Sequence, residues 1–183
     1  MRKYLVFLVF LVLFFPINAI CSIYYSAGAN YLIPTEKFKD KNKKSLGIKL
    51  EVMNKNYCRL WYGLRIDQFN LKKENEISYY KKETLISPVV KYSPFVRDCF
   101  DNKFLPYIEG QIILSSISGT DNLSKLGFGG GLGLGLAYNF KCFKKCWMID
   151  AQAIYSAPNF IYRADKRENL KSINCGLSLS VSL

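Results

Sequence analysis

A strict two-residue alternation over residues 126–140 constrains the fold of this chain more than any other feature. The stretch reads LGFGGGLGLGLAYNF, with large apolar residues at most even positions and glycine at most odd positions. Such a period of two is typical of a β-strand whose two faces differ. Because glycine costs entropy and packs nothing, a strand that turned the glycine face to water would be weak. The pattern predicts a strand with its apolar face toward lipid and its bare face toward a narrow interior.

The N-terminus predicts a signal peptide over residues 1–19. Two basic residues precede an apolar run at 4–15, and the next residues lead to Ala19, a small residue suited to cleavage. The run is shorter than the ~20 residues of a transmembrane helix. Cys21 suggests lipidation as an alternative, although the residues before it make a poor lipidation site. We expect export, with residues 20–183 forming one β-barrel domain in the outer membrane.

Further segments with alternating hydrophobicity follow the signal, and no long helical period accompanies them. The expected strands are 23–33, 46–53, 57–71, 78–95, 105–116, 126–140, 147–157 and 173–183. Connections after the first, third, fifth and seventh strands are longer or more polar, which is typical of outer loops opposite short periplasmic turns. Only helices and closed barrels satisfy every backbone group in lipid. The sequence therefore predicts an all-β fold, an eight-stranded antiparallel up-and-down transmembrane β-barrel.

The second face of these strands carries few charges, with basic and acidic residues in equal number. The expected interior ionic network comprises Lys49, Glu51, Arg59, Arg65, Asp67, Lys91, Glu109 and Asp150. Eight strands facing water would carry more charge, whereas charges sealed in a lumen must pair because an unpaired one is costly. Eight strands enclose only enough space for side chains to fill. We therefore predict a plugged polar interior and not an open pore.

Two other classes of protein compete with this interpretation. The same alternation fits a soluble secreted β-barrel that holds apolar side chains inside and binds a small apolar ligand. An enzyme is disfavoured because the chain has no histidine, which removes Ser-His-Asp triads and most zinc sites. A Ser/Asp mechanism is left open. We expect a non-enzymatic protein without catalytic residues, cofactor or metal, contributing to envelope integrity or surface contact.

The six cysteines are an even number on an oxidising export route. Cys142 and Cys146 flank a short predicted turn and are placed to form a disulfide, and Cys58 and Cys99 are a second candidate pair. The spacing of Cys142 and Cys146 also occurs in metal sites, but no histidine or third nearby cysteine completes one. We expect Cys175 to face lipid.

Basic residues gather in the first predicted outer loop of a chain whose formal charge is +12. The expected basic outer loop contains Lys37, Lys39, Lys41, Lys43 and Lys44. A basic surface favours anionic partners such as lipopolysaccharide or anionic glycan, with an ordinary solvated loop as the alternative. Nucleic acid is not expected, because exposed aromatic residues are not interleaved with the charges. We expect a monomer in contact with outer-membrane lipid.

At this level of detail the chain resembles the small eight-stranded outer-membrane β-barrel family of the OmpA/OmpX type over residues 22–183. The resemblance rests on the glycine-rich strand ending at 138–140, on the motifs at 93–97 and 105–110, and on the terminal strand. Family members usually end in an aromatic residue, whereas this chain ends in Leu183. The resemblance implies a closed membrane barrel and brings no catalytic signature with it.

Overall fold

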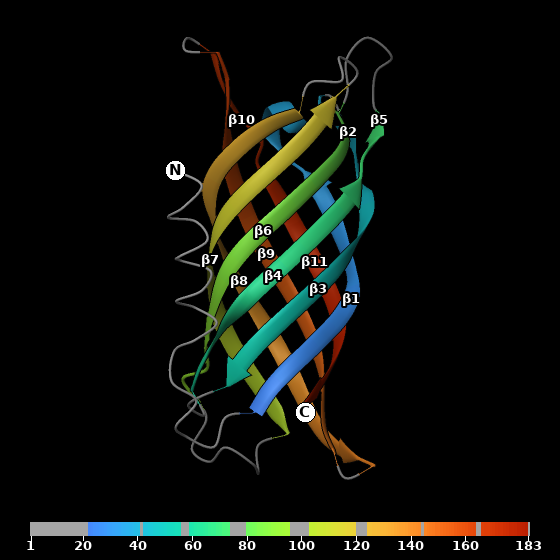
Figure 1. Ribbon diagram of the computed structural model, residues 1–183, viewed down its shortest axis with the longest axis vertical. Helices are drawn as coiled ribbons and strands as arrows, with labels where there is room; N and C mark the ends of the chain where they lie inside the picture. The colour runs from blue at the N-terminus through green and yellow to red at the C-terminus, as the bar shows by residue number, and fades with distance from the viewer. Residues whose placement is uncertain are drawn as a thin grey trace.

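The computed structural model describes residues 22–40, 42–55, 59–73, 80–95, 103–119, 124–143, 145–163 and 166–182. They form a closed barrel of long, tilted strands (Figure 1). Its eight wall strands are β1 (Ser22–Pro34), β3 (Ser45–Lys55), β4 (Leu60–Asn70), β6 (Tyr80–Tyr92), β7 (Phe104–Gly119), β8 (Ser124–Cys142), β9 (Lys145–Arg163) and β11 (Ser172–Ser182). Four short elements lie between them: η1 (Glu36–Phe38), β2 (Asn42–Lys43), β5 (Lys72–Lys73) and β10 (Lys166–Asn169).

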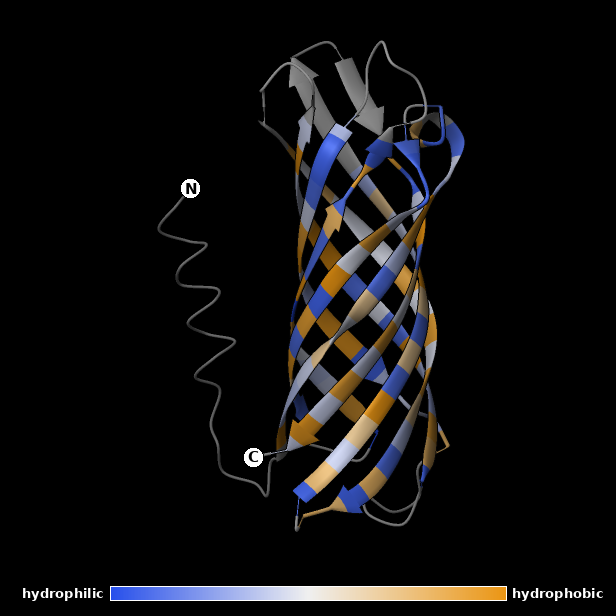
Figure 2. Cartoon of the chain, turned by 90° about the vertical axis from the view of Figure 1, so that its right-hand side faces the viewer, coloured by the Kyte–Doolittle hydropathy of each residue, from blue (hydrophilic) through white to orange (hydrophobic). Residues whose placement is uncertain are grey.

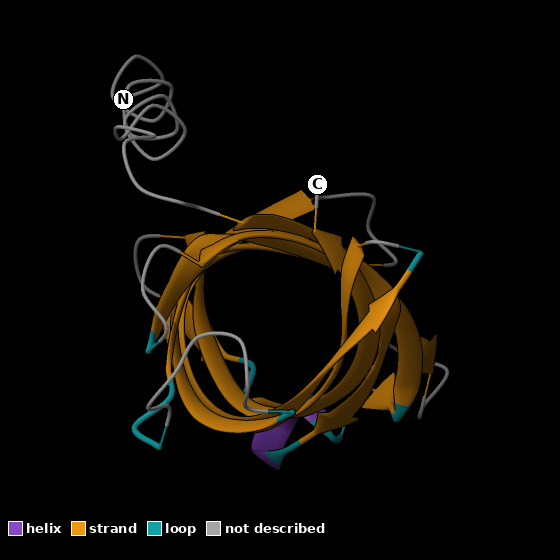
Figure 3. Ribbon diagram, turned by 90° about the horizontal axis from the view of Figure 1, so that it is seen from below, coloured by secondary structure: helices purple, strands orange, loops and turns teal. Residues whose placement is uncertain are grey.

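The wall has an up-and-down topology in which each strand pairs antiparallel with its neighbours in the chain. The pairing of β1 with β11 joins the first strand to the last, for example at Ala29 and Leu177. The pairing of β8 with β9, for example at Leu134 and Ala153, completes the circle. Viewed along its axis, the wall is a ring (Figure 3). The predicted all-β eight-stranded antiparallel barrel is confirmed.

Alternation along each strand places apolar side chains outside the barrel and charged side chains inside it. Leu132 and Leu134 on β8 are 74% and 66% exposed, whereas Lys49 on β3 and Arg65 on β4 are 1% and 0% exposed. The bands of alternating hydropathy are visible along the wall in Figure 2. A soluble barrel would show the opposite arrangement, since burial of apolar area stabilises folding in water. The structure therefore contradicts the soluble, apolar-cored alternative.

The barrel has two unlike ends. The end that we call the loop end carries the connections β1–β3, β4–β6, β7–β8 and β9–β11, and the turn end carries the other three connections, the start of β1 and the end of β11. The loop end contains more regular structure than the sequence predicts. The first connection contains η1 and β2, and β2 pairs with β5 of the next connection. In the last connection, β9 continues to Arg163 and pairs with β10.

Strand bounds at the turn end differ most from the prediction in two places. Strand β4 begins at Leu60, although the alternation predicted a start at residue 57. Strand β6 ends at Tyr92 and not at residue 95, because Pro94 has no backbone N–H to continue a ladder. Ser93 leaves the strand, and its backbone N–H donates to the carbonyl of Arg59 at 2.8 Å.

Two layers of buried apolar side chains lie inside the barrel, one toward each end. The layer toward the loop end contains Leu32, Phe38, Phe69, Leu71, Tyr80, Leu85, Ile113, Ile117 and Leu170. The layer toward the turn end contains Tyr24, Met53, Trp61, Val89, Leu105, Tyr107, Ala137 and Met148. The ring centroids of Trp61 and Tyr107 are 5.7 Å apart. These layers place the polar part of the interior between two apolar parts.

In the described part of the chain, no helix has both the length and the apolar character needed to cross a membrane. The predicted signal peptide at 1–19 lies outside the described residues, as does Cys21, and the signal peptide stays a prediction.

Candidate functional site

The middle of the barrel interior holds a cluster of charged side chains centred on Arg65 of β4. The guanidinium of Arg65 donates to both carboxylate oxygens of Glu109 on β7, at 2.5 and 2.8 Å. Two more of its donors reach Glu51 on β3, at 3.1 and 3.0 Å. A bidentate Arg–carboxylate pair is among the strongest polar contacts in proteins. Arg65 therefore links three wall strands through groups that are almost fully buried.

Two lysines extend this cluster across the lumen to β9. Lys91 on β6 lies 2.8 Å from Glu51 and 2.8 Å from Asp150 on β9. Lys49 on β3 lies 2.9 Å from Glu51 and 3.6 Å from Asp150. Neither β3 nor β6 is a neighbour of β9 in the sheet. These ion pairs consequently span the interior and connect opposite parts of the wall.

Neutral side chains complete the cluster. The amide oxygen of Gln152 accepts from Lys49 at 2.9 Å and from Arg65 at 3.0 Å. The hydroxyl of Tyr107 donates to Asp150 at 2.5 Å. Sequence reasoning did not select Tyr107 or Gln152 as site residues. Tyr107 lies two residues from Glu109 on β7, and Gln152 lies two residues from Asp150 on β9. Each therefore points to the same face as a predicted charged residue, and this spacing of two is the signal that could have located them.

Asp67 and Glu83 lie in the interior toward the loop end. The side-chain amide of Asn30 on β1 donates to Asp67. The hydroxyl of Ser115 donates to Glu83 at 3.3 Å. Glu83 is 2% exposed and shares the parity of Lys91 on β6, yet the sequence analysis did not include it. Among the described residues, the buried charged side chains thus include five acids and three bases.

Arg59 is the one member of the predicted interior ionic network whose side chain lies outside the barrel interior. It precedes the first paired residue of β4, Leu60, and its side chain is exposed at the turn end. The prediction failed because alternation fixes the direction of a side chain only inside the ladder. Seven of the eight predicted side chains are buried within the barrel, and six of those seven are joined by ion pairs.

The inward face of β8 is bare, and side chains from its neighbours occupy the space beside it. A Cβ added at Gly135 would lie 2.1 Å from the Tyr107 ring, and one at Gly131 would lie 2.6 Å from the Gln111 amide. The glycines of β8 therefore make room for side chains of the adjacent β7.

The loop end carries a basic depression of about 1150 Å³ formed by the first loop and β5. Four lysines line it, Lys39, Lys43, Lys44 and Lys72, together with the acidic residues Glu36 and Asp40. Buried Asn42 fixes this loop, because its side chain donates to the backbone carbonyls of Lys72 and Tyr80 at 3.2 and 2.8 Å. Lys41 of the predicted basic loop lies outside the described residues, and the side chain of Lys37 is not described.

An ion pair joins the first loop to the last loop beside this depression. Lys171 lies 2.7 Å from Glu36, and the backbone N–H of Thr35 donates to the carbonyl of Lys171 at 2.9 Å. The hydrogen bond to Glu36 raises the pKa of Lys171 above its ordinary value. The amine is therefore charged at neutral pH.

Cys142 and Cys146 are free thiols in the structure, in contrast to the disulfide suggested by their spacing. The hairpin register pairs Lys141 with Cys146 and Cys142 with Lys145, so the two cysteines are offset and not directly opposite. Cys175 is exposed on the outward face of β11. Cys58 and Cys99 lie outside the described residues.

Within the described ranges, no group of three or more His, Cys, Asp and Glu side chains is arranged to hold a metal ion. An apolar outer wall around an ion-paired interior defines a small β-barrel of the outer-membrane type. Known structures share this fold. Neisserial surface protein A aligns with 89% of this chain and 99% of its own, with a TM-score of 0.64 and 14% identity.

Two proteins of Pseudomonas aeruginosa are also similar in structure. The outer membrane protein OprG gives a TM-score of 0.55 at 10% identity, over 90% of this chain and 96% of its own. The N-terminal β-barrel domain of OprF gives 0.53 at 13% identity, over 90% and 98%. No protein-family model matches the sequence, and neither does any curated protein. The fold is that of small outer-membrane barrels.

Proposed function

We propose that this chain is a non-enzymatic outer-membrane barrel whose loop end makes contact with anionic lipopolysaccharide or glycan. A signal peptide at 1–19 would direct its export, and the barrel would act as a monomer. The observation that carries the proposal is the separation of charge. Six of the eight charged side chains described as buried in the interior are joined by ion pairs, and four lysines of the loop end line an open depression.

The interior supports a structural role and not a transport role. Ion pairs cross the lumen at its middle, and an apolar layer lies toward each end. A solute that crosses the lumen would have to separate these ion pairs. Separating paired charges in a buried site is costly. We therefore expect a plugged barrel with negligible conductance.

The loop end supports binding of anionic groups. Lys39 and Lys44 are exposed, and Lys72 lies beside them because β5 pairs with β2. Each lysine near an anionic surface contributes about 1 kcal/mol, an interaction that salt weakens. The anchoring of the loop by Asn42 holds these lysines together before any partner arrives, which lowers the ordering cost of binding.

The test compares two triple variants of the folded full barrel. Lys39→Gln/Lys44→Gln/Lys72→Gln removes three positive charges from the loop end. Lys103→Gln/Lys141→Gln/Lys145→Gln removes three exposed charges from the turn end and serves as the matched control. We expect immobilised lipopolysaccharide and heparin to retain the wild type and the control, and to release the loop-end variant at clearly lower salt. Equal elution of all three proteins would reject the proposed surface contact.

The plugged interior is tested separately in planar lipid bilayers. We expect insertion of the wild-type barrel, verified by a shift in gel mobility on boiling, without stepwise conductance. Steady conductance steps would show an open pore and would contradict the proposal.

A further inference from the structure

The glycines of this barrel fall into two groups that differ in what surrounds them. Most of those described in the wall point inward and are sterically required. An added Cβ would lie 2.2 Å from the Leu177 carbonyl oxygen at Gly28, 2.0 Å from the Val52 carbonyl oxygen at Gly63, and 2.7 Å from Ala153 and Ile154 atoms at Gly133. Contacts this short exclude any side chain without movement of the backbone. Packing of the barrel explains these glycines completely.

Gly110 on β7 and Gly130 on β8 have no such explanation. They share the outward parity of Ile112 and Leu132. An added Cβ would meet nothing closer than 4.0 Å at Gly110 and 3.6 Å at Gly130. A side chain there would be tolerated, and glycine in a strand weakens it through backbone entropy. Packing within the barrel therefore does not account for the bare surface at these two positions.

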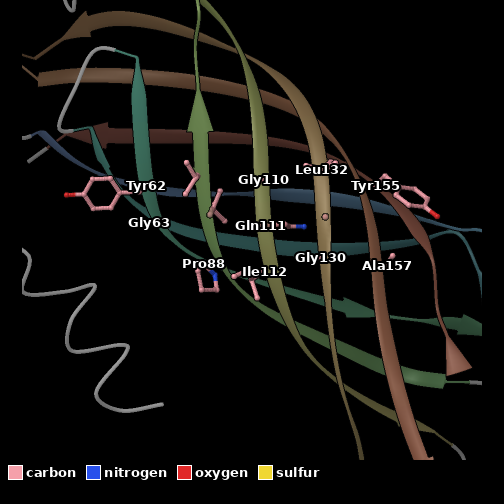
Figure 4. A pocket seen from close by; sticks show the side chains of 13 residues that line it. Tyr62, Gly63, Pro88, Gly110, Gln111, Ile112, Gly130, Leu132, Tyr155 and Ala157 are labelled. Carbon is pink, nitrogen blue, oxygen red and sulfur yellow. The ribbon is translucent and has the colours of Figure 1, made fainter. Parts of the chain in front are cut away.

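The two glycines form the floor of a groove in the outer wall, shown in Figure 4. The groove has a volume of about 800 Å³ and an almost wholly apolar lining, and it crosses β4, β6, β7, β8 and β9. Pro88 also lines it, at the interruption of the β6–β7 pairing between Ile86 and Val89. A second depression of about 700 Å³ continues it, sharing the lining residues Val90, Gly110, Leu132 and Tyr155.

The position of the groove limits what can fill it. Gly110 and Gly130 lie in the middle parts of their strands, at the level of the hydrocarbon core in a membrane-spanning barrel. Water is excluded from that region, and an empty groove would forfeit the dispersion contacts of every atom in its lining. The occupant must therefore be apolar and slender enough to reach the glycine floor.

We propose that this groove binds one acyl chain of an outer-membrane lipid, held against the backbone at Gly110 and Gly130. The proposal rests on the membrane location given under the proposed function. An extended hydrocarbon chain matches a groove that is elongated across five strands and continues into a second depression. A second copy of the barrel matches it poorly, because two convex walls meet along a narrow strip (Figure 3) and leave most of such a groove unfilled.

The test uses the full chain folded into phosphatidylglycerol vesicles that contain a small fraction of the same lipid with a diazirine at the middle of one acyl chain. After photolysis, mass spectrometry measures the adducts on each wall. We expect roughly threefold more label on Ile112 and Leu132 than on Ile48 and Leu50 of β3, the strand opposite β8 in the ring, a gain that a handful of additional atom contacts supports. All four side chains are more than half exposed, so they provide a fair comparison.

Variants identify the glycines as the cause. Gly110→Leu/Gly130→Leu places bulk in the groove at positions where an added Cβ would come no closer than 4.0 and 3.6 Å to other atoms, and it should reduce the label to the level of the opposite wall. Ala27→Leu/Ala29→Leu adds the same kind of bulk on exposed positions of β1 and should leave the ratio unchanged. A shift in gel mobility on boiling verifies that each variant is folded. Gly110→Ala/Gly130→Ala provides a milder pair of substitutions and should give an intermediate ratio.

Three outcomes would overturn the acyl-chain site. One is equal labelling of both walls in the wild type, and another is an unchanged ratio in the groove-filling variant. The third is a wild-type dimer that the groove-filling variant converts to a monomer, which would assign the groove to a second copy. Failure of the membrane location would look different, because neither wall would then be labelled.

Discussion

The two sides of the barrel interior use opposite means to fill the same space. Strands β3 and β4 contribute long charged side chains, including Lys49, Glu51 and Arg65. Strand β8 contributes a row of glycines, with Ala137 at its end. The charged side fills the lumen with its own side chains, whereas the bare side leaves room for side chains of its neighbours, because the narrow lumen of an eight-stranded barrel cannot accommodate large side chains from every strand. The comparison teaches that interior glycines make room for neutral side chains beside the charges, such as Tyr107 at Gly135 and Gln111 at Gly131.

The charged side also depends on the other strands for its chemistry. Asp150 lies on β9, outside the charged side. It forms an ion pair with Lys91 of β6 and accepts a hydrogen bond from the hydroxyl of Tyr107 on β7. The ring of Tyr107 lies over the space at Gly135 and 4.9 Å from the Lys91 amine. A bulkier β8 would displace Tyr107 and so disturb the ion pairs that it helps to hold.

The largest expected effect comes from removing the centre of the charged side. Arg65→Met leaves the carboxylate of Glu109 without its bidentate partner in a buried site and leaves Glu51 with only its two lysine partners. Breaking a buried ion pair from one side costs about 3–5 kcal/mol, so we expect the free energy of unfolding to fall by that order. Urea unfolding of the barrel in lipid bilayers, followed by tryptophan fluorescence and gel mobility, measures the change.

Two further variants sharpen this measurement. Adding Glu109→Gln to Arg65→Met removes one of the stranded charges and should restore part of the loss. Arg59→Ala changes an exposed arginine at the turn end and should alter stability by no more than about 0.5 kcal/mol. If Arg59→Ala and Arg65→Met unfolded at the same urea concentration, the interior ion pairs would have no special role in stability.

A smaller effect is expected on the bare side. Gly135→Ala places a methyl group within the ring of Tyr107, which is held by Asp150 and cannot move freely. Overpacking of this kind costs about 1–3 kcal/mol. The same unfolding assay should show a smaller cost when the alanine is combined with Tyr107→Leu, which removes the clashing atoms.

Gly130→Ala is the matched control on the same strand, because its methyl group would make only an ordinary van der Waals contact, 3.6 Å from the Gln111 carbonyl oxygen. We expect this variant to be at least as stable as the wild type, since alanine loses less backbone entropy than glycine. Equal destabilisation by Gly135→Ala and Gly130→Ala would refute the pairing of bare and charged sides.

The smallest effect is expected at the loop end, outside the compared region. Lys171→Met removes the exposed ion pair with Glu36, and such pairs contribute little. Because the pKa of Lys171 is raised, its contribution is complete below its unfolded pKa and is lost only as pH rises through the folded pKa. We expect Lys171→Met and the wild type to have the same unfolding midpoint, within error, at every pH between about 6 and about 9. A change of midpoint within this range would show that the pair supports the loop more strongly than its exposure suggests.

Alternation in the sequence was sufficient to locate eight strands and to orient most of their side chains. The buried state of Lys49 and the exposed state of Leu134 both follow from parity, because side chains of a strand point to opposite faces in turn. Parity failed at Arg59, where the chain had left the ladder. It also could have identified Glu83, whose neighbours Leu85 and Lys91 share its face.

The sequence by itself determined the number of strands, the inverted faces of the wall and most of the charges that enter the lumen, since each depends on a local period of two. Tertiary structure alone decided which charges meet. Lys49 and Lys91 reach Asp150 across the barrel, and Tyr107 occupies the space that Gly135 leaves. These contacts join strands far apart in the chain, and their geometry depends on the stagger and closure of the whole sheet, which no local pattern encodes.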